Sequence, residues 1–273
     1  MTETTAPAAP AKYTKQTITA KTIWQAEKLF SLKVTRDPCF QFIPGQFARL
    51  GLAVHDPQTQ VPNEWRAYSM VSHPDQDELE FFSVLVPEGM FSPAMARLEP
   101  GAPLWIDKTS FGFLTLERFT DGQDLWLVAT GTGLSAYLSM LRDPATWLRF
   151  KRIVLVHGVR HAAELAYGHE LISLTAAHAR GQFIYLPVTS QEPVSPGSSP
   201  CVGPLRTAAR ITTLLASGEL EQRTNLVLDP LTSRVMLCGN PAMVSEMRAQ
   251  LSARGFAPGR RGVAGNLAVE NYW

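Results

Sequence analysis

Four consecutive residues, Arg66-Ala67-Tyr68-Ser69, combine side chains that could hold a flat, phosphorylated cofactor. A guanidinium group can grip a diphosphate through two parallel hydrogen bonds, and a tyrosine ring can cover a planar ring system. The serine hydroxyl can bond to a ring heteroatom. If this stretch is a strand, alternation places Arg66, Tyr68 and Met70 on one side of it. An ordinary strand with an exposed arginine explains these residues equally well. The rest of the sequence must therefore decide whether they form a cofactor site.

A second segment, residues 84–92, leads from Val84 through Gly89 and Met90 into a short predicted helix. Ser92 is the expected N-cap of this helix, followed by a proline at the first helical position. The amide groups at a helix N-terminus favour phosphate oxygens, and Gly89 would let the backbone approach them closely. Many loop-to-helix turns share these features, so the segment alone indicates little.

A third segment, Thr130-Gly131-Thr132-Gly133, follows the apolar run 125–129 and precedes the predicted helix 134–141. Ala136 occupies the position where the full dinucleotide fingerprint would place a third glycine. A lone Gly-x-Gly is often only a tight turn between a strand and a helix. The predicted strand–turn–helix context favours a phosphate loop, because ligands of open parallel sheets bind beyond the carboxyl ends of strands.

The end of the chain carries two further motifs. Residues 238–243, Cys-Gly-Asn-Pro-Ala-Met, place Cys238 at the end of an apolar run and Met243 in the helix that follows. A cysteine in such a place is most often a small buried residue. The chain closes with residues 269–273, Val-Glu-Asn-Tyr-Trp, where aromatic residues either cap the core or stack on a ligand.

The elements that must position these motifs differ between the two halves of the chain. From about residue 15 to residue 116, short apolar runs (47–52, 79–86 and 104–106) alternate with Pro, Gly and Asp clusters, which predicts an antiparallel barrel or sandwich. After a polar stretch at 117–123, the apolar runs 125–129, 153–156, 183–188 and 235–238 alternate with helical patterns at 134–141, 162–179, 208–215 and 241–254. This order predicts a parallel sheet covered on both faces by helices.

The composition excludes several classes of protein. The 273 residues are 45% hydrophobic with a formal net charge of +1, which argues against disorder and against a nucleic-acid binder. The three cysteines are too few for an iron–sulfur cluster, which takes about four ligands. No zinc motif is present, and no apolar run approaches the roughly 20 residues of a membrane span. Residues 1–12 do not resemble a secretion signal, so the cytosol is the expected compartment.

The motifs and their order resemble those of the ferredoxin–NADP reductase family, in particular its bacterial flavodoxin/ferredoxin branch. The resemblance extends from about residue 13 to residue 273, including the closing Tyr-Trp. It implies an FAD-binding barrel over residues 13–120 and a Rossmann-like NADP(H)-binding domain over residues 121–273, whose tail folds back on FAD. The FAD ligands it implies are Arg66, Ala67, Tyr68, Ser69, Val84, Gly89, Met90, Ser92, Thr132, Tyr272 and Trp273.

The same resemblance implies an NADP site and a catalytic group. The NADP ligands are Thr130, Gly131, Thr132, Gly133, Arg160, Ser190, Arg206, Arg210, Cys238, Gly239 and Met243, and the catalytic residues are Tyr68, Ser69, Cys238 and Glu270. Cys238 would line the nicotinamide pocket without acting as a nucleophile. Gln191 stands where the branch usually has an arginine for the 2′-phosphate, so we expect only a moderate preference for NADPH.

The implied reaction carries electrons between NADP(H) and ferredoxin or flavodoxin through FAD, with hydride transfer to the flavin and single electrons to the carrier. The resemblance also implies that the protein is a monomer. We expect the acidic carrier to dock on a basic surface formed by Arg248, Arg254, Arg260 and Arg261. Two alternatives stay open: an NAD(P)H-dependent reductase of free flavin, and a non-catalytic flavin-binding carrier or sensor. The motif after Cys238 argues against the sensor, because a sensor needs no nicotinamide pocket.

Overall fold

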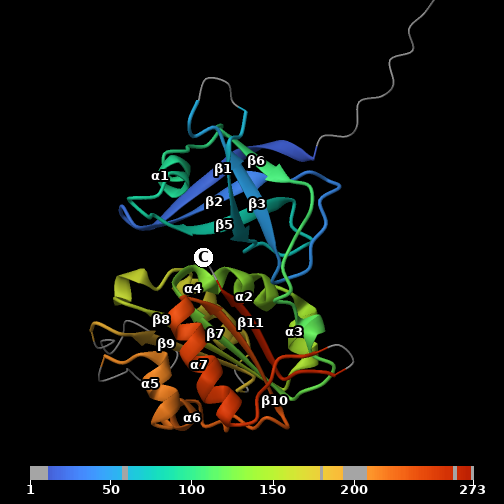
Figure 1. Ribbon diagram of the computed structural model, residues 1–273, viewed down its shortest axis with the longest axis vertical. Helices are drawn as coiled ribbons and strands as arrows, with labels where there is room; N and C mark the ends of the chain where they lie inside the picture. The colour runs from blue at the N-terminus through green and yellow to red at the C-terminus, as the bar shows by residue number, and fades with distance from the viewer. Residues whose placement is uncertain (1–11, 57–60, 179–180, 193–207, 261–262, 272–273) are drawn as a thin grey trace, which may run out of the picture.

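A computed structural model describes residues 12–56, 61–178, 181–192, 208–260 and 263–271. An antiparallel sheet lies above a parallel sheet with its helices (Figure 1). The predicted fold class, a barrel followed by a Rossmann-like α/β unit, is confirmed. Helices α2 (Leu134–Leu141) and α4 (Gly168–Ala177) lie on the side of the parallel sheet that faces the barrel (Figure 1).

The antiparallel sheet has six strands in the order β4-β3-β6-β1-β2-β5. Their bounds are β1 Tyr13–Gln25, β2 Leu29–Thr35, β3 Phe47–Leu52, β4 Glu64–Ser69, β5 Glu78–Val84 and β6 Pro103–Asp107. The two edge strands meet through a bridge between Met70 and Phe81, and the Val71 N–H donates to the Glu80 carbonyl at 2.8 Å. These contacts curl the sheet into a barrel around buried leucine and phenylalanine side chains.

The short helix α1 (Phe91–Ala96) begins one residue before the predicted serine cap. The N-cap is Met90, which makes no side-chain capping bond, so the prediction that Ser92 caps the helix is wrong. The Ser92 hydroxyl instead accepts a hydrogen bond from the Val86 N–H at 2.9 Å. The serine therefore closes the turn that precedes the helix, which is another common use of a short hydroxyl side chain.

The parallel sheet has five strands in the order β11-β10-β7-β8-β9. Their bounds are β7 Asp124–Thr130, β8 Arg152–Val159, β9 Phe183–Thr189, β10 Ser233–Gly239 and β11 Leu267–Asn271. The apolar runs of the sequence form the first four of these strands. Alternate side chains of each strand enter different cores: Leu125 and Leu127 pack with α2 and α4, whereas Trp126 and Val128 pack on the opposite face.

The opposite face is covered by α5 (Ile211–Ala216), α6 (Glu219–Thr224) and α7 (Pro241–Ala253). Helix α7 begins and ends with the residues that the sequence predicts. The Asn240 side chain accepts hydrogen bonds from the Ala242 and Met243 N–H groups, at 2.9 and 3.3 Å, and Pro241 occupies the first turn. Gly255 follows the helix with φ of +89°, a conformation that favours glycine.

The helix expected over residues 162–179 is interrupted. A 3-10 turn, η3 (Ala162–Glu164), precedes α4, and between them Tyr167 adopts a left-handed conformation with φ of +59°. The Tyr167 hydroxyl donates to Glu80 Oε1 of the barrel at 2.8 Å, and its ring packs on Trp24 with ring centroids 4.3 Å apart. Contacts with the barrel therefore override the helical pattern of this segment.

The strand order contains one switch point. The chain passes from β7 to β8 and β9 on one side, then returns to β10 on the other side of β7. The chain therefore leaves β7 and β10 toward opposite faces of the sheet, and the usual ligand site of such sheets lies at this switch point, beyond the carboxyl ends of the strands. The loops after both strands carry motifs that the sequence singled out.

Candidate functional site

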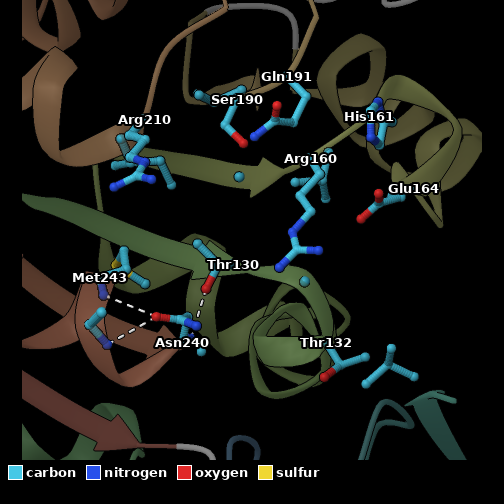
Figure 2. A pocket seen from close by; sticks show the side chains of 18 of the residues that line it. Thr130, Thr132, Arg160, His161, Glu164, Ser190, Gln191, Arg210, Asn240 and Met243 are labelled. Carbon is cyan, nitrogen blue, oxygen red and sulfur yellow. Dashed lines mark hydrogen bonds between the residues drawn. The ribbon is translucent and has the colours of Figure 1, made fainter. Parts of the chain in front are cut away.

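A cavity of about 980 Å³ lies at the carboxyl ends of the parallel strands and reaches the barrel. The barrel contributes the segment 84–87 and the hairpin residues Lys28 and Leu29. The parallel unit contributes, among others, Thr130, Gly131, Thr132, Arg160, Ser190, Gln191, Arg210, Gly239 and Met243. The cavity thus brings together eight of the predicted NADP ligands, Gln191 and, from the barrel, the predicted flavin ligand Val84. Figure 2 shows many of these side chains around it.

The loops after β7 and β10 are locked together at the switch point. The Asn240 N–H donates to Thr130 Oγ1 at 2.8 Å, as Figure 2 shows. A Cβ atom on Gly133 would stand 2.5 Å from the Cys238 carbonyl oxygen, and one on Gly239, whose φ is +130°, would stand 2.3 Å from Thr130 Oγ1. Glycine is required at both positions because the two backbones touch.

Gly131 differs from these two glycines. Its φ is +53°, and a Cβ atom added there would meet no atom within 4 Å. The backbone of Gly131 is therefore open to the cavity that it lines. This geometry fits the close approach of a nucleotide diphosphate, so the residues present suit an NADP(H) ligand.

Basic and polar side chains surround the outer part of the cavity. Arg160 follows β8 and extends toward Thr130, while Arg210, the N-cap of α5, lies on the other side (Figure 2). Ser190 and Gln191 lie above them (Figure 2). The Glu192 carboxylate accepts a hydrogen bond from the Ala162 N–H at 2.6 Å and lies 3.6 Å from His161 Nδ1. Its charge is therefore partly engaged by neighbouring groups.

The string Arg66–Ser69 forms most of edge strand β4. Arg66 and Ala67 are exposed, Tyr68 is half-buried and Ser69 is buried. Simple alternation does not describe this strand, because it turns into the barrel at the Met70 bridge. The Arg66 guanidinium contacts Glu64 Oε2 at 3.1 Å and the Trp65 carbonyl at 2.8 Å. Its exposure leaves room for a ligand phosphate.

Tyr68 stands between the strand and helix α1. Its ring lies 5.8 Å from that of Phe91, and burial raises the pKa of its hydroxyl. Gly89 closes a turn through its N–H to the Val86 carbonyl at 2.9 Å, and the Met90 side chain is half exposed. None of Arg66, Tyr68, Gly89 or Ser92 lines the 980 Å³ cavity, whereas Val84 does. Among the predicted flavin residues of the barrel, Val84 therefore lies at the cavity, and Arg66, Tyr68, Gly89 and Ser92 lie beyond it.

Cys238 and Glu270 are brought side by side on neighbouring strands β10 and β11. Cys238 is fully buried, as a structural cysteine would be. Burial raises the pKa of Glu270 to about 7, and its Oε2 atom has no hydrogen-bond partner among the described residues. Its other carboxylate oxygen lies 3.1 Å from the place of a Cβ on Gly112, so Glu270 faces the barrel. Neither residue lines the cavity. Arg206, Tyr272 and Trp273 lie outside the described residues.

Comparison with known proteins identifies the family. The oxidoreductase NAD-binding domain family matches residues 127–249. The ferredoxin–NADP reductase A of Sorangium cellulosum (strain So ce56) is 37% identical over 265 residues, which cover 94% of this chain and 89% of that protein. The flavodoxin/ferredoxin–NADP reductase of Escherichia coli (strain K12) is 36% identical over 248 residues, covering 90% and 94% of the two chains. The chain belongs to the ferredoxin/flavodoxin–NADP reductase family.

A solved relative has the same fold over nearly its whole length. The crystal structure of a ferredoxin NADP+ reductase from Neisseria gonorrhoeae with bound FAD and NADP matches with a TM-score of 0.84 and 33% identity. The match covers 96% of this chain and 100% of that chain. The resemblance drawn from the sequence motifs is therefore confirmed at the level of the family.

In this member of the family, three side chains at or below the cavity wall carry no sequence motif: Lys28 and Glu164 line the cavity, and His157 lies beneath it. His157 of β8 is fully buried below the glycine loop, where its Nε2 lies 3.1 Å from the Gly131 carbonyl. Burial lowers the pKa of His157 to about 4, so the ring is neutral and can donate to that carbonyl. Lys28 and Glu164 form an ion pair at 2.7 Å across the two units. A histidine in a strand and charges in turns give no local signal of such roles.

The expected basic docking surface is not supported. The Arg254 guanidinium is engaged by Glu221 Oε1 at 2.7 Å, and Arg261 lies outside the described residues. Helix α7 begins at the cavity and runs away from the barrel (Figure 1), and its 13 residues span about 20 Å. Arg254 and Arg260 follow its far end, so a carrier docked there would stand far from a flavin held at the barrel.

Among the residues that the structure describes, no helix combines the length and apolar character needed to cross a membrane. Within the same residues, no three His, Cys, Asp or Glu side chains are grouped so as to hold a metal ion.

Proposed function

We propose that this protein is a flavoprotein reductase that transfers electrons between NADP(H) and ferredoxin or flavodoxin through bound FAD. Family membership supports this function, and the cavity between the barrel and the switch point is the observation that carries it. A site at this place lets one unit hold the flavin and the other hold the nicotinamide. The named relatives are reductases of both carrier proteins.

The proposed flavin site uses the outer side of the barrel. When bound, FAD supplies the exchange between two-electron hydride chemistry and one-electron transfer. The exposed Arg66 would pair with the diphosphate, and Tyr68 would support the ring system. Ser69 would hydrogen-bond the ring, while Val84, Gly89 and Met90 would lie along the remaining length. Glu270 faces the barrel, and its Oε2 atom, which has no hydrogen-bond partner among the described residues, suits a polar group brought in by the ligand.

The proposed nucleotide site uses the two locked loops. Gly131 would admit the diphosphate, and Arg160, Ser190 and Arg210 would hold the 2′-phosphate end. Gly239 and Met243 line the cavity next to Cys238 at the end of β10. Cys238 would shape the nicotinamide end from its buried position. We divide the chain between these two functions at residues 13–120 and 121–273.

An absorption spectrum of the purified protein tests the proposal. We expect the protein to retain FAD on dialysis, to show the yellow colour of oxidised flavin and to lose that colour when NADPH is added without oxygen. A protein that releases its flavin on dialysis and works only with added flavin would be a reductase of free flavin. A protein whose bound flavin is not bleached by NADPH would be a carrier or a sensor.

A further inference from the structure

One ion pair joins the two units directly at the cavity. Lys28 Nζ lies 2.7 Å from Glu164 Oε1, and both residues line the cavity wall. Lys28 belongs to the barrel and Glu164 to the turn η3 of the parallel unit. The Lys28 side chain is 35% exposed and that of Glu164 is 10% exposed. The pair is therefore accessible to a ligand in the cavity from the lysine side.

The barrel holds the backbone of Lys28 in place, whereas the ammonium group of its side chain is held by the Glu164 carboxylate of the other unit. Lys28 follows Glu27, whose φ of +55° makes the tight turn between β1 and β2. The Lys28 carbonyl accepts a hydrogen bond from the Leu85 N–H at 2.8 Å. This bond ties the hairpin to the segment after β5. The flexible four-carbon stem then lets the ammonium group change partners without movement of the barrel.

A second set of contacts between the units is of a different kind. The Arg142 guanidinium, just after α2, bonds to Glu80 Oε2 and to the Val71 carbonyl, both at 2.9 Å, and to both oxygens of Glu170. These contacts are shared among several groups, and the Glu80 side chain is buried. Such a network fixes the two units to each other. The single contact between Lys28 and Glu164 is the one that a ligand can replace.

The charges on the cavity wall favour such a replacement. Among the described residues of the wall, the lysine and arginine residues are Lys28, Arg160 and Arg210, and the acidic residues are Glu164 and Glu246. A diphosphate between the glycine loop and the segment 84–87 would be an anion competing with Glu164 for the Lys28 ammonium. A charge-assisted bond to phosphate is at least as strong as one to a carboxylate.

We propose that Lys28 binds the diphosphate of NADP(H). Without the nucleotide, its ammonium group pairs with Glu164, and the diphosphate replaces this carboxylate when NADP(H) binds. Glu164 then acts as a competitor that lowers nucleotide affinity, and Lys28 as a ligand supplied by the barrel to a nucleotide on the other unit. This inference rests on the proposed function, since it assumes that NADP(H) occupies the cavity.

The two variants of the pair should change affinity in opposite directions. The measurement that tests this is NADP+ binding to the FAD-loaded protein, followed through the change in the flavin spectrum. Lys28→Met should weaken binding about tenfold, the effect of losing one charge-assisted contact. Glu164→Gln should tighten it about threefold. In the Lys28→Met background, Glu164→Gln should have no effect, because the lysine it releases is absent.

Three control variants separate this account from general effects of charge or folding. Lys21→Met breaks another lysine–glutamate pair, Lys21 with Glu99 at 2.6 Å, outside the cavity lining. It should leave NADP+ affinity unchanged. Glu99→Gln is the matching control for the acid, with the same expectation. Glu246→Gln removes a second acid from the cavity, and any change it causes should persist in the Lys28→Met background.

Several outcomes would overturn the assignment. They are unchanged affinity in Lys28→Met, weaker binding in Glu164→Gln, or tightening by Glu164→Gln that persists without Lys28. A Lys28→Met protein that loses FAD but binds NADP+ normally would assign the lysine to FAD and contradict the proposal. If the wild-type protein bound no NADP+, the proposed function itself would fail, which is a distinct result.

Discussion

Arg66 presents its guanidinium at the exposed edge of the barrel, where Glu64 and the Trp65 carbonyl hold it. Replacing it by alanine should remove one charge-assisted contact to the FAD diphosphate, worth about 1.5–3 kcal/mol. We therefore expect Arg66→Ala to lose FAD on dialysis against a chaotropic salt that leaves the wild type loaded. Arg118→Ala, at an exposed arginine of η1 (Leu116–Arg118), is the control. Equal retention in both variants would show that Arg66 is not a flavin ligand.

Nucleotide preference should depend on the cations at the outer end of the cavity. The 2′-phosphate carries nearly two negative charges, which Arg160 and Arg210 can meet, whereas Gln191 adds a donor without charge. We expect a moderate preference for NADPH, increased by Gln191→Arg and reduced by Arg160→Ala or Arg210→Ala. The measurement is kcat/KM for NADPH and NADH.

The exposed Arg248 on α7 supplies the matched control for this series. Arg248→Ala should leave the ratio of the two kcat/KM values unchanged. Equal efficiency of the wild type with both nucleotides, or an unchanged ratio on loss of Arg210, would contradict the assignment of the 2′-phosphate site.

The raised pKa of Glu270 predicts a dependence of stability on pH. Its pKa is about 7 in the folded protein, above the value of 4.5 for an unperturbed glutamate. As pH rises between these values, the unfolded chain releases the proton while the folded protein retains it, so the free energy of unfolding falls. Above pH 7 the folded protein carries the full cost of a charged, largely buried carboxylate.

Glu270→Gln should remove this dependence. The free energy of unfolding of the variant, relative to wild type, should rise by about 2 kcal/mol between about pH 5 and pH 8. Urea denaturation of the flavin-free proteins at the two pH values measures this difference. Glu88→Gln, at an exposed glutamate, should show no such change. A difference independent of pH would mean that Glu270 titrates normally.

At the scale of elements, the loop after β7 allows a matched comparison of two glycines. Gly131 and Gly218 have φ of +53° and +75°, and a Cβ on either would meet no atom within 4 Å. Alanine at either position should cost about 1–2 kcal/mol of stability through backbone strain. Only Gly131→Ala should also raise the KM for NADPH severalfold, because its methyl group would occupy the space of the diphosphate. Equal KM values in the two variants would place the nucleotide elsewhere.

The elements were predictable where local signals and tertiary packing agree. Helix α7 has its cap, its first-turn proline and its terminating glycine in the sequence, and all three act as expected. The segment 162–179 was not predictable, because the Tyr167 hydroxyl reaches Glu80 on the other unit and imposes a left-handed residue. The prediction that Ser92 caps α1 was wrong because a short hydroxyl side chain can close the turn before a helix as well as cap the helix itself.

At the scale of the molecule, the order of a barrel and a parallel unit follows from the change in hydrophobic pattern near residue 120. The glycine and cysteine motifs then meet because both follow strands that flank the switch point. The contacts between the units had no sequence signal. Lys28 and Glu164 are 136 residues apart, and only the folded arrangement makes them neighbours. The predicted docking surface is not supported by the position of Arg254 and Arg260 beyond the far end of α7, because sequence proximity of arginines does not show where their helix leads.

The central claim is that electrons pass from NADPH through FAD to a carrier protein. The most direct test mixes catalytic amounts of the FAD-loaded protein with NADPH and an oxidised ferredoxin or flavodoxin in the absence of oxygen, and follows the carrier's absorbance. We predict reduction of the carrier at a rate proportional to the protein concentration and strongly diminished in Arg66→Ala without added FAD. Bleaching of the flavin by NADPH with no reduction of either carrier would contradict the account.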